Sequence, residues 1–294
     1  MLRQARSRTE TRNPDLVAQP REGDESNLAW GERAARAMAA AGPEAWTYVA
    51  LLGGSDTLSF RLRLAQAHLR SDMLPSYWSE AILVELEGAA LAGARAIHVP
   101  LLQPEGPGFA TRANGVVSRP LADFADIVRY PNIALIALPV PQVEIMRRVA
   151  DFKRSRSTLD ALEHVLRWLA FSWGVARSGN PLHENYGLPS ACMLETVCAA
   201  AGLDLTPGLE SRASCPEAIW SAATYWQDYF RKAHDGKIPM GRFHHPHYYP
   251  ITEPRDDRLR PPAAGVAPPA GPSPSPSAPP PPASPPSRGR RQKR

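Results

Sequence analysis

Residues 187–220 read GLPSACMLETVCAAAGLDLTPGLESRASCPEAIW and contain two helix starts. Pro189 precedes an apolar run with helical spacing, which predicts a helix over Ser190–Ala201. A second helix is predicted over Pro216–Lys232. Helix N-termini stabilise anionic groups through free N–H groups and the helix macrodipole. Either helix start could therefore stabilise an anionic nucleophile or a developing oxyanion.

A second motif, WSEAILV at residues 78–84, lies about a hundred residues upstream and has the apolar character of a strand. Together, in this order, the two segments resemble the circularly permuted NlpC/P60 group of papain-like amidases, related to the YaeF/YiiX-like and lecithin:retinol acyltransferase-like proteins. In that group a W-S-H-V-G strand supplies the base. A later helix beginning C-S-E-L-V, followed by an A-G-(I/L)-(D/E)-L turn, supplies the thiol. The resemblance covers roughly residues 46–230 and implies an α+β papain-like fold, with an antiparallel sheet packed on helices.

Both catalytic positions of the group are altered in this chain. Counted back from the AGLDL turn, the cysteine of the group falls on Ser190, and Cys192 misses that register by two residues. Glu80 stands where the group has its histidine. Placing residues 96–99 against the group's V-I-E segment puts His98 at the position of the third polar residue. The resemblance thus implies a Ser190–His98–Glu80 grouping in which base and acid have exchanged places.

The residues themselves leave alternatives open. A serine hydroxyl is far less acidic than a thiol and needs a base beside it, so Ser190 is either an activated nucleophile or a plain helix N-cap. Cys192 is the alternative nucleophile, but on a helix it lies about 200° from Ser190, and it is otherwise an ordinary partly buried thiol. His98 is either a member of the site or a sheet histidine in a degenerate one.

Charge and cysteine content limit the possible partners and compartments. The net charge is +5, and the last seven residues, Arg288–Arg294, carry four arginines and one lysine, so the rest of the chain is close to neutral. No specific nucleic-acid partner is expected. No signal peptide and no transmembrane segment is visible. Three cysteines without metal-like spacing suit a reducing compartment, which predicts a cytoplasmic location.

Composition predicts three parts. Residues 1–25 are expected to be a disordered lead-in, 26–253 one folded domain, and 254–294 a disordered Pro/Ser/Ala-rich tail with a basic end. Of the 32 prolines, 13 lie in residues 261–294. The order of helix, strands and then helices indicates an α+β domain and not an alternating βαβ one. Further helices are expected near 27–41, 58–69, 143–153 and 159–173, and strands near 48–52, 78–85, 94–102, 115–117, 120–124 and 132–138.

Other motifs are weaker. The histidines at 234, 244, 245 and 247 lack a standard ligand spacing, so no metal is expected; a turn packed with neighbouring aromatic residues is the preferred interpretation. Residues 53–56, GGSD, do not form a phosphate loop, so no nucleotide cofactor is expected either. The GPG segment at 106–108 is expected to be a loop tip near the sheet.

Three functions are compatible with the sequence. The first is a hydrolase or acyltransferase acting on an amide or ester of a small-molecule, peptide or lipid acyl substrate, with Ser190 as nucleophile. The second is a catalytically silent module that binds a peptide, a peptidoglycan fragment or a protein partner and is tethered by its proline-rich tail. The third is a scaffold recruited through that tail to SH3-like or acidic partners.

Overall fold

A computed structural model of the protein describes residues 16–39, 47–87, 90–102, 111–157, 159–233, 240–246 and 251. The chain divides into two units, Met1–Pro254 and Arg255–Arg294, and all described residues belong to the first. The predicted tail, the loop tip at 106–108 and the histidines at 234 and 247 lie outside the described residues.

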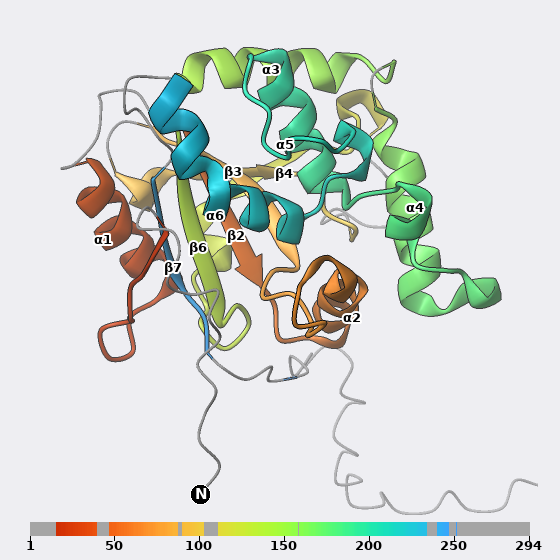
Figure 1. Ribbon diagram of the computed structural model, residues 1–294, viewed down its shortest axis with the longest axis horizontal. Helices are drawn as coiled ribbons and strands as arrows, with labels where there is room; N and C mark the ends of the chain where they lie inside the picture. The colour runs from red at the N-terminus through yellow and green to blue at the C-terminus, as the bar shows by residue number, and fades with distance from the viewer. Residues whose placement is uncertain are drawn as a thin grey trace, which may run out of the picture. The chain divides into compact units, whose positions relative to one another are not determined.

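In the described part of the chain, seven strands form one mixed sheet in the order β1-β7-β6-β2-β3-β4-β5 (Figure 1). The strands are β1 (Leu16–Ala18), β2 (Thr47–Gly53), β3 (Glu80–Glu85), β4 (Arg95–His98), β5 (Val117–Pro120), β6 (Asn132–Leu138) and β7 (Met240–His244). β1 and β7 pair in parallel, and the other five neighbouring pairs are antiparallel.

Six α-helices accompany the sheet in these residues, with short 3₁₀ turns between them. The helices are α1 (Asn27–Ala39), α2 (Thr57–Ala65), α3 (Gln142–Arg154), α4 (Ala161–Trp173), α5 (Pro189–Ala200) and α6 (Pro216–Ala233). The 3₁₀ turns are η1 (Ala67–Leu69), η2 (Leu91–Gly93), η3 (Thr111–Ala113), η4 (Leu121–Phe124), η5 (Val175–Arg177), η6 (Pro181–Glu184) and η7 (Ser211–Ala213). None of the helices in the described ranges combines the length and the apolar character needed to cross a bilayer.

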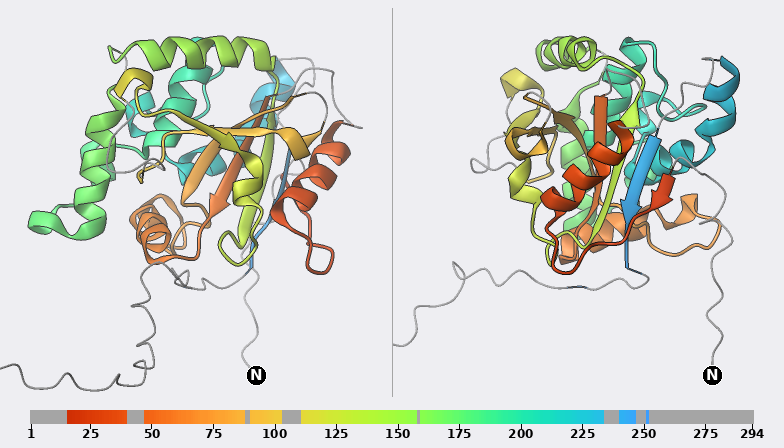
Figure 2. Two further views of the ribbon diagram at one scale, coloured as in Figure 1. Left: turned by 180° about the vertical axis from the view of Figure 1, so that it is seen from behind. Right: turned by 90° about the vertical axis from the view of Figure 1, so that its left-hand side faces the viewer.

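The sheet is buried on both faces, and side chains alternate between two cores. In β2, Val49 and Leu51 join the core that α2 to α6 cover, whereas Tyr48, Ala50 and Leu52 join the core beneath α1, η2 and η4. Successive side chains of a strand point to opposite faces, which produces this division. Figure 2 shows α1 on one side of the sheet and α6 on the opposite side. Every residue of β2 and β6 is buried, as expected for central strands with both faces covered.

The α+β class is confirmed, whereas the expectations for residues 16–18 and 120–124 are wrong. Leu16–Ala18, predicted to belong to a disordered lead-in, form β1 and pair with Gly241–Phe243 of β7. Three residues are too few to show a strand periodicity in the sequence. The segment becomes a strand because β7 offers it an edge to pair with. Residues 120–124 were predicted to form a strand. Only Pro120 belongs to one, as the last residue of β5, and the next four residues form the 3₁₀ turn η4. Pro120 lacks the N–H of a ladder residue, which suits the end of an edge strand.

Candidate functional site

The N-terminus of α5 lies where strands β3 and β4 separate. The antiparallel ladder between them runs from Glu85 opposite Arg95 to Leu83 opposite Ile97, and it ends there. Beyond this point the backbone of Val99 is no longer paired with β3. Pro189 is the first residue of α5 and Leu188 is its cap, without a side-chain capping bond. The predicted helix start is thus one residue late, and Ser190 is not the N-cap.

The hydroxyl of Ser190 bonds the backbone that the ladder leaves unpaired. Its Oγ accepts a hydrogen bond from the Val99 N–H at 3.1 Å and donates one to the Val99 carbonyl at 3.0 Å. Ser190 is 3% exposed, so both bonds lie in the protein interior. A hydroxyl has one proton, and here that proton is hydrogen-bonded to a carbonyl oxygen. A carbonyl oxygen cannot act as a general base. The contact fastens α5 to the end of β4.

Glu80 and His98 are brought together, as the resemblance implied for neighbouring strands. His98 Nδ1 lies 3.8 Å from Glu80 Oε1. The imidazole is buried, its ring centroid is 5.6 Å from that of Phe124 in an edge-on arrangement, and neither ring nitrogen has a hydrogen-bond partner among the described residues. Arg119 approaches the same Phe124 ring from β5, with its guanidinium carbon 4.3 Å from the centroid.

Ser190 does not join this pair. Ile97 and Val99 point into the core that holds α5, so His98 between them points to the other face, where Ala96 and Phe124 lie. The expected grouping of Ser190, His98 and Glu80 is therefore not formed. The physical reason is the two-residue period of a strand. Ser190 contacts Val99, and the residue next to it, His98, points to the opposite face of the sheet.

The space next to Ser190 is small. A cavity of about 10 Å³ lies where the start of α5 meets the ends of β3 and β4. Its lining includes Glu80, Ala81, Val99, Ser190 and Pro216. Such a volume holds about one water molecule. An acyl group of a substrate does not fit beside the hydroxyl in this conformation.

Cys192, the alternative nucleophile, is also bound to the backbone. Its thiol donates to the carbonyls of Arg212 at 3.1 Å and Ser214 at 3.4 Å, and the residue is fully buried. Burial, with a contribution from the nearby Cys215, raises the pKa of the Cys192 thiol well above its ordinary value. A reactive cysteine needs the opposite shift, toward the thiolate.

The structure reveals a cysteine–histidine contact that the sequence analysis missed. His164 of α4 places Nδ1 3.8 Å from the Cys192 sulfur. The same nitrogen lies 3.0 Å from the Gly187 carbonyl, and because a carbonyl only accepts, Nδ1 carries the proton and donates it. Burial lowers the pKa of His164, so the ring is held neutral. The signal that could have revealed this contact is the position of His164 directly before the apolar Val165, on the side of α4 that is buried.

Gly187 closes this arrangement from the loop before α5. Its N–H donates to the Arg212 carbonyl at 2.7 Å. A Cβ on this residue would lie 2.0 Å from the Ser214 carbonyl oxygen and 2.7 Å from the Cys192 sulfur. Only glycine fits between the two segments. The cysteine, the histidine and the glycine together form a packed structural joint and not an open catalytic centre.

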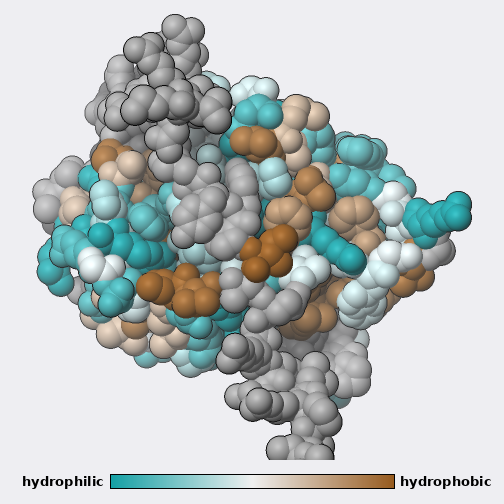
Figure 3. All heavy atoms as spheres, turned by 90° about the horizontal axis from the view of Figure 1, so that it is seen from below, coloured by the Kyte–Doolittle hydropathy of each residue, from teal (hydrophilic) through white to brown (hydrophobic). Residues whose placement is uncertain are grey.

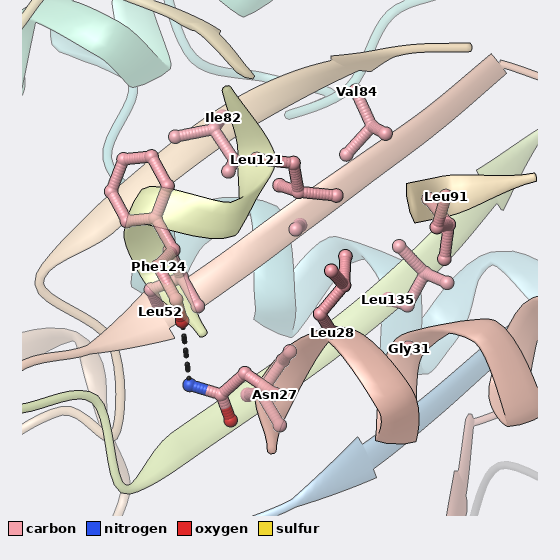
Figure 4. Close-up of a pocket in the computed structure, with 12 residues that line it drawn as sticks. Asn27, Leu28, Gly31, Leu52, Ile82, Val84, Leu91, Leu121, Phe124 and Leu135 are labelled. Atoms are coloured by element: carbon pink, nitrogen blue, oxygen red, sulfur yellow. Dashed lines mark hydrogen bonds between the residues drawn. The ribbon is translucent and has the colours of Figure 1, made fainter. Parts of the chain in front are cut away.

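A second cavity lies on the opposite face of the sheet, between α1, η4 and the strands (Figure 4). Its volume is about 20 Å³ and its lining is almost wholly apolar. The amide of Asn27 stands at one end but is already used, because it donates to the Phe124 and Tyr130 carbonyls at 2.9 Å each. The cavity has neither the size nor the polar groups of a ligand site.

Within the described ranges, no group of three histidine, cysteine or acidic side chains is arranged to hold a metal ion. His244 ends β7, and the ring of His245 stacks on those of Tyr77 and Phe243 at centroid distances of 3.8 and 5.2 Å.

The chain matches no protein-family model, no curated protein and no solved structure. The resemblance to the permuted NlpC/P60 group accordingly rests on the residues of the two motifs.

Proposed function

We propose that this chain is a catalytically silent relative of the permuted NlpC/P60 papain-like group that acts by binding a peptide or protein partner. The observation that carries the proposal is the double hydrogen bond between the Ser190 hydroxyl and the backbone of Val99. A serine nucleophile must give its proton to a base, and this proton is committed to a carbonyl. The helix start that carries chemistry in the group has become a structural joint.

The surroundings of Ser190 support the same proposal. The imidazole of His98, the residue before Val99, faces the other core, and the cavity at the hydroxyl is about 10 Å³. Cys192 donates to two carbonyls and has a raised pKa, so it offers no thiolate in place of the hydroxyl. Each of these features removes a different requirement of nucleophilic catalysis: base, space and activated sulfur.

A variant amide or ester hydrolase is the second candidate, and the contact between Glu80 and His98 favours it. The Glu80 carboxylate lies 3.8 Å from Nδ1, beyond hydrogen-bond distance, and on closer approach it could orient the ring as the carboxylate of a catalytic dyad does. For Ser190 to use this dyad, the imidazole would have to reach the other face of the sheet and the bonds to Val99 would have to open.

A fluorophosphonate probe with a fluorescent reporter separates the two candidates. The wild-type protein, Ser190→Ala and His98→Leu are incubated with the probe at pH 8 and examined by intact-protein mass spectrometry. The silent module predicts no stoichiometric adduct on any of the three. An adduct on the wild type that disappears in Ser190→Ala would refute the proposal, and its loss in His98→Leu as well would establish the hydrolase with His98 as its base.

A further inference from the structure

Two histidines from distant parts of the chain meet at the surface, away from the α5 joint. His68 belongs to η1, directly after α2, and His183 belongs to η6. Their ring centroids are 4.8 Å apart, with an angle of 72° between the ring planes. α2 lies at the bottom of the folded unit in Figure 1, and the face seen from below shows hydrophilic residues beside hydrophobic ones (Figure 3). Both histidines are exposed, so a hydrated ion can reach the two imidazoles from solvent.

A backbone carbonyl fixes the tautomer of His68. The Nδ1 atom of this ring lies 3.1 Å from the Ala65 carbonyl oxygen. Because a carbonyl only accepts, Nδ1 carries the proton, and Nε2 of the neutral ring keeps a free lone pair. Histidines that bind a metal ion usually donate their other ring N–H to a carbonyl or a carboxylate, which orients the ring and raises its basicity. His68 thus has the hydrogen bond that is typical of a metal ligand.

The same carbonyl positions the turn that carries His183. The Asn180 amide donates to the Ala65 carbonyl at 2.7 Å, and Asn180 Oδ1 accepts from the Leu182 N–H at 3.1 Å. The N–H of His183 donates to the Asn180 carbonyl at 3.0 Å. Asn180 therefore holds η6 against the end of α2 and keeps His183 beside His68. Binding of an ion does not have to order this backbone, and a preorganised site gains affinity for that reason.

The separation of the two rings suits one ion between them. A metal ion about 2.1 Å from each ligating nitrogen, with an angle between a right angle and the tetrahedral angle, places the ring centroids about 4.5–5 Å apart. The observed separation of 4.8 Å lies in this range. The rings now meet edge to face. The exposed ring of His183 has no hydrogen bond to another described residue, so it can turn a nitrogen toward the ion without losing one.

The local electrostatics favour a metal cation at the neutral rings. Burial and the neighbouring His183 lower the pKa of His68, so its ring is neutral at pH 7 and its lone pair is available. Ala65 is the last residue of α2, and the carbonyl end of a helix carries a partial negative charge that attracts cations. Both effects act in the same direction, since the first removes the competing proton and the second attracts the ion.

The protein supplies two ligands and leaves the other coordination positions open. In the described ranges no third histidine, cysteine or acidic side chain completes the cluster. Glu184, which follows His183, is paired with Arg167 at 2.9 Å. Imidazole nitrogens suit Zn²⁺, Cu²⁺ and Ni²⁺, whereas Mg²⁺ and Ca²⁺ prefer oxygen ligands. The chemistry of the pair therefore selects a transition-metal ion.

We propose that His68 and His183 form a binding site for one divalent transition-metal ion of the zinc, copper and nickel class, with water at the remaining positions. Nε2 of His68 and a ring nitrogen of His183 are the ligands, and Asn180 is a positioning residue. The bound ion links η1 to η6 and so ties the segment before α5 to the end of α2. The inference goes beyond the proposed function and uses no residue of the α5 joint.

Isothermal titration calorimetry with ZnCl₂ on the full-length protein at pH 7.5 tests the site. We expect saturable binding by the wild type, and His68→Gln and His183→Gln should each weaken it at least about tenfold. MgCl₂ is the control for the class of ion and should give no saturable binding. A double variant, His244→Gln with His247→Gln, is the matched control for the other histidines of the chain and should bind Zn²⁺ as the wild type does. At pH 5 protons compete for the imidazoles, so the affinity should fall at least about tenfold.

Three results would overturn the site: no saturable Zn²⁺ binding by the wild type, wild-type affinity in either His68→Gln or His183→Gln, or loss of binding in the double variant at 244 and 247. Circular dichroism of each variant confirms that it is folded before its affinity is compared. Thermal melts give a second readout, because an ion that binds only the folded pairing raises the midpoint of unfolding. The midpoint should rise with ZnCl₂ more in the wild type than in either single variant. An equal rise in all three would contradict the link between η1 and η6.

Discussion

Replacing Ser190 by alanine should destabilise the fold, whereas removal of an active-site serine usually leaves stability unchanged or raises it. The substitution removes two hydrogen bonds and leaves the N–H and C=O of Val99 buried without their partner. An unsatisfied buried polar group costs about 1–3 kcal/mol, and a water entering the enlarged cavity recovers part of that, so we expect a loss of about 2–4 kcal/mol. With a urea m-value of about 2–3 kcal/mol/M, the midpoint should fall by about 1 M.

Urea unfolding followed by tryptophan fluorescence measures this loss, and Ser172→Ala provides a matched control. Ser172 is also a buried helical serine, at 2% exposure, but its hydroxyl has no hydrogen-bond partner among the described residues. Its removal should change the free energy of unfolding by less than about 0.5 kcal/mol or increase it. The reasoning is refuted if the two variants are equally stable, or if Ser190→Ala is as stable as the wild type.

Three further predictions concern the buried groups around the site. Gly187→Ala should cost more than about 3 kcal/mol in the same unfolding assay, because its Cβ would meet the Ser214 carbonyl at 2.0 Å; a loss below 1 kcal/mol would contradict the packing. The cysteine thiols are all buried with raised pKa values, so native protein at pH 8 should not react with Ellman's reagent within an hour, whereas urea-unfolded protein should release three equivalents. Burial raises the pKa of Glu217 from 4.5 to about 7 against the opposing effect of Arg70, so the folded state holds a proton that the unfolded state releases. The contribution of Glu217 to stability should therefore fall by about 3 kcal/mol as the pH rises from about 4.5 to 7, and Glu217→Gln should flatten the pH dependence by about that amount; an unchanged slope would exclude this carboxyl as a source of it.

The fold was predictable where a long periodic segment decides the local structure. The strand predicted at 132–138 is β6 with the same bounds, and the helix predicted over Ser190–Ala201 is α5 shifted by one residue. β1 could not be predicted, since Leu16–Ala18 become a strand only because β7 offers an edge. β7 itself lies in a segment whose histidines suggested a turn. Partner-dependent strands carry no signal in their own residues.

The site was predictable in position but not in orientation. Motif register placed Ser190 at a helix start against the sheet and Glu80 beside His98, and the structure has both contacts. Which face of the sheet α5 covers depends on the packing of five helices, and that choice decides whether His98 or its neighbour Val99 meets the hydroxyl. A shift of one residue along a strand exchanges the two faces. The contact of Cys192 with His164 was missed for a similar reason, because it joins two helices whose packing no local pattern specifies.

Amide hydrogen exchange at Val99, followed by NMR, tests most directly whether the Ser190 hydroxyl serves the backbone. In the wild type this amide should be protected to a degree comparable with the ladder amides of β6. In Ser190→Ala its protection should drop by at least about tenfold more than theirs, since it alone loses its acceptor, and Ser172→Ala should show no such difference. Equal changes at Val99 and in β6, or a fast-exchanging Val99 amide in the wild type, would contradict the account.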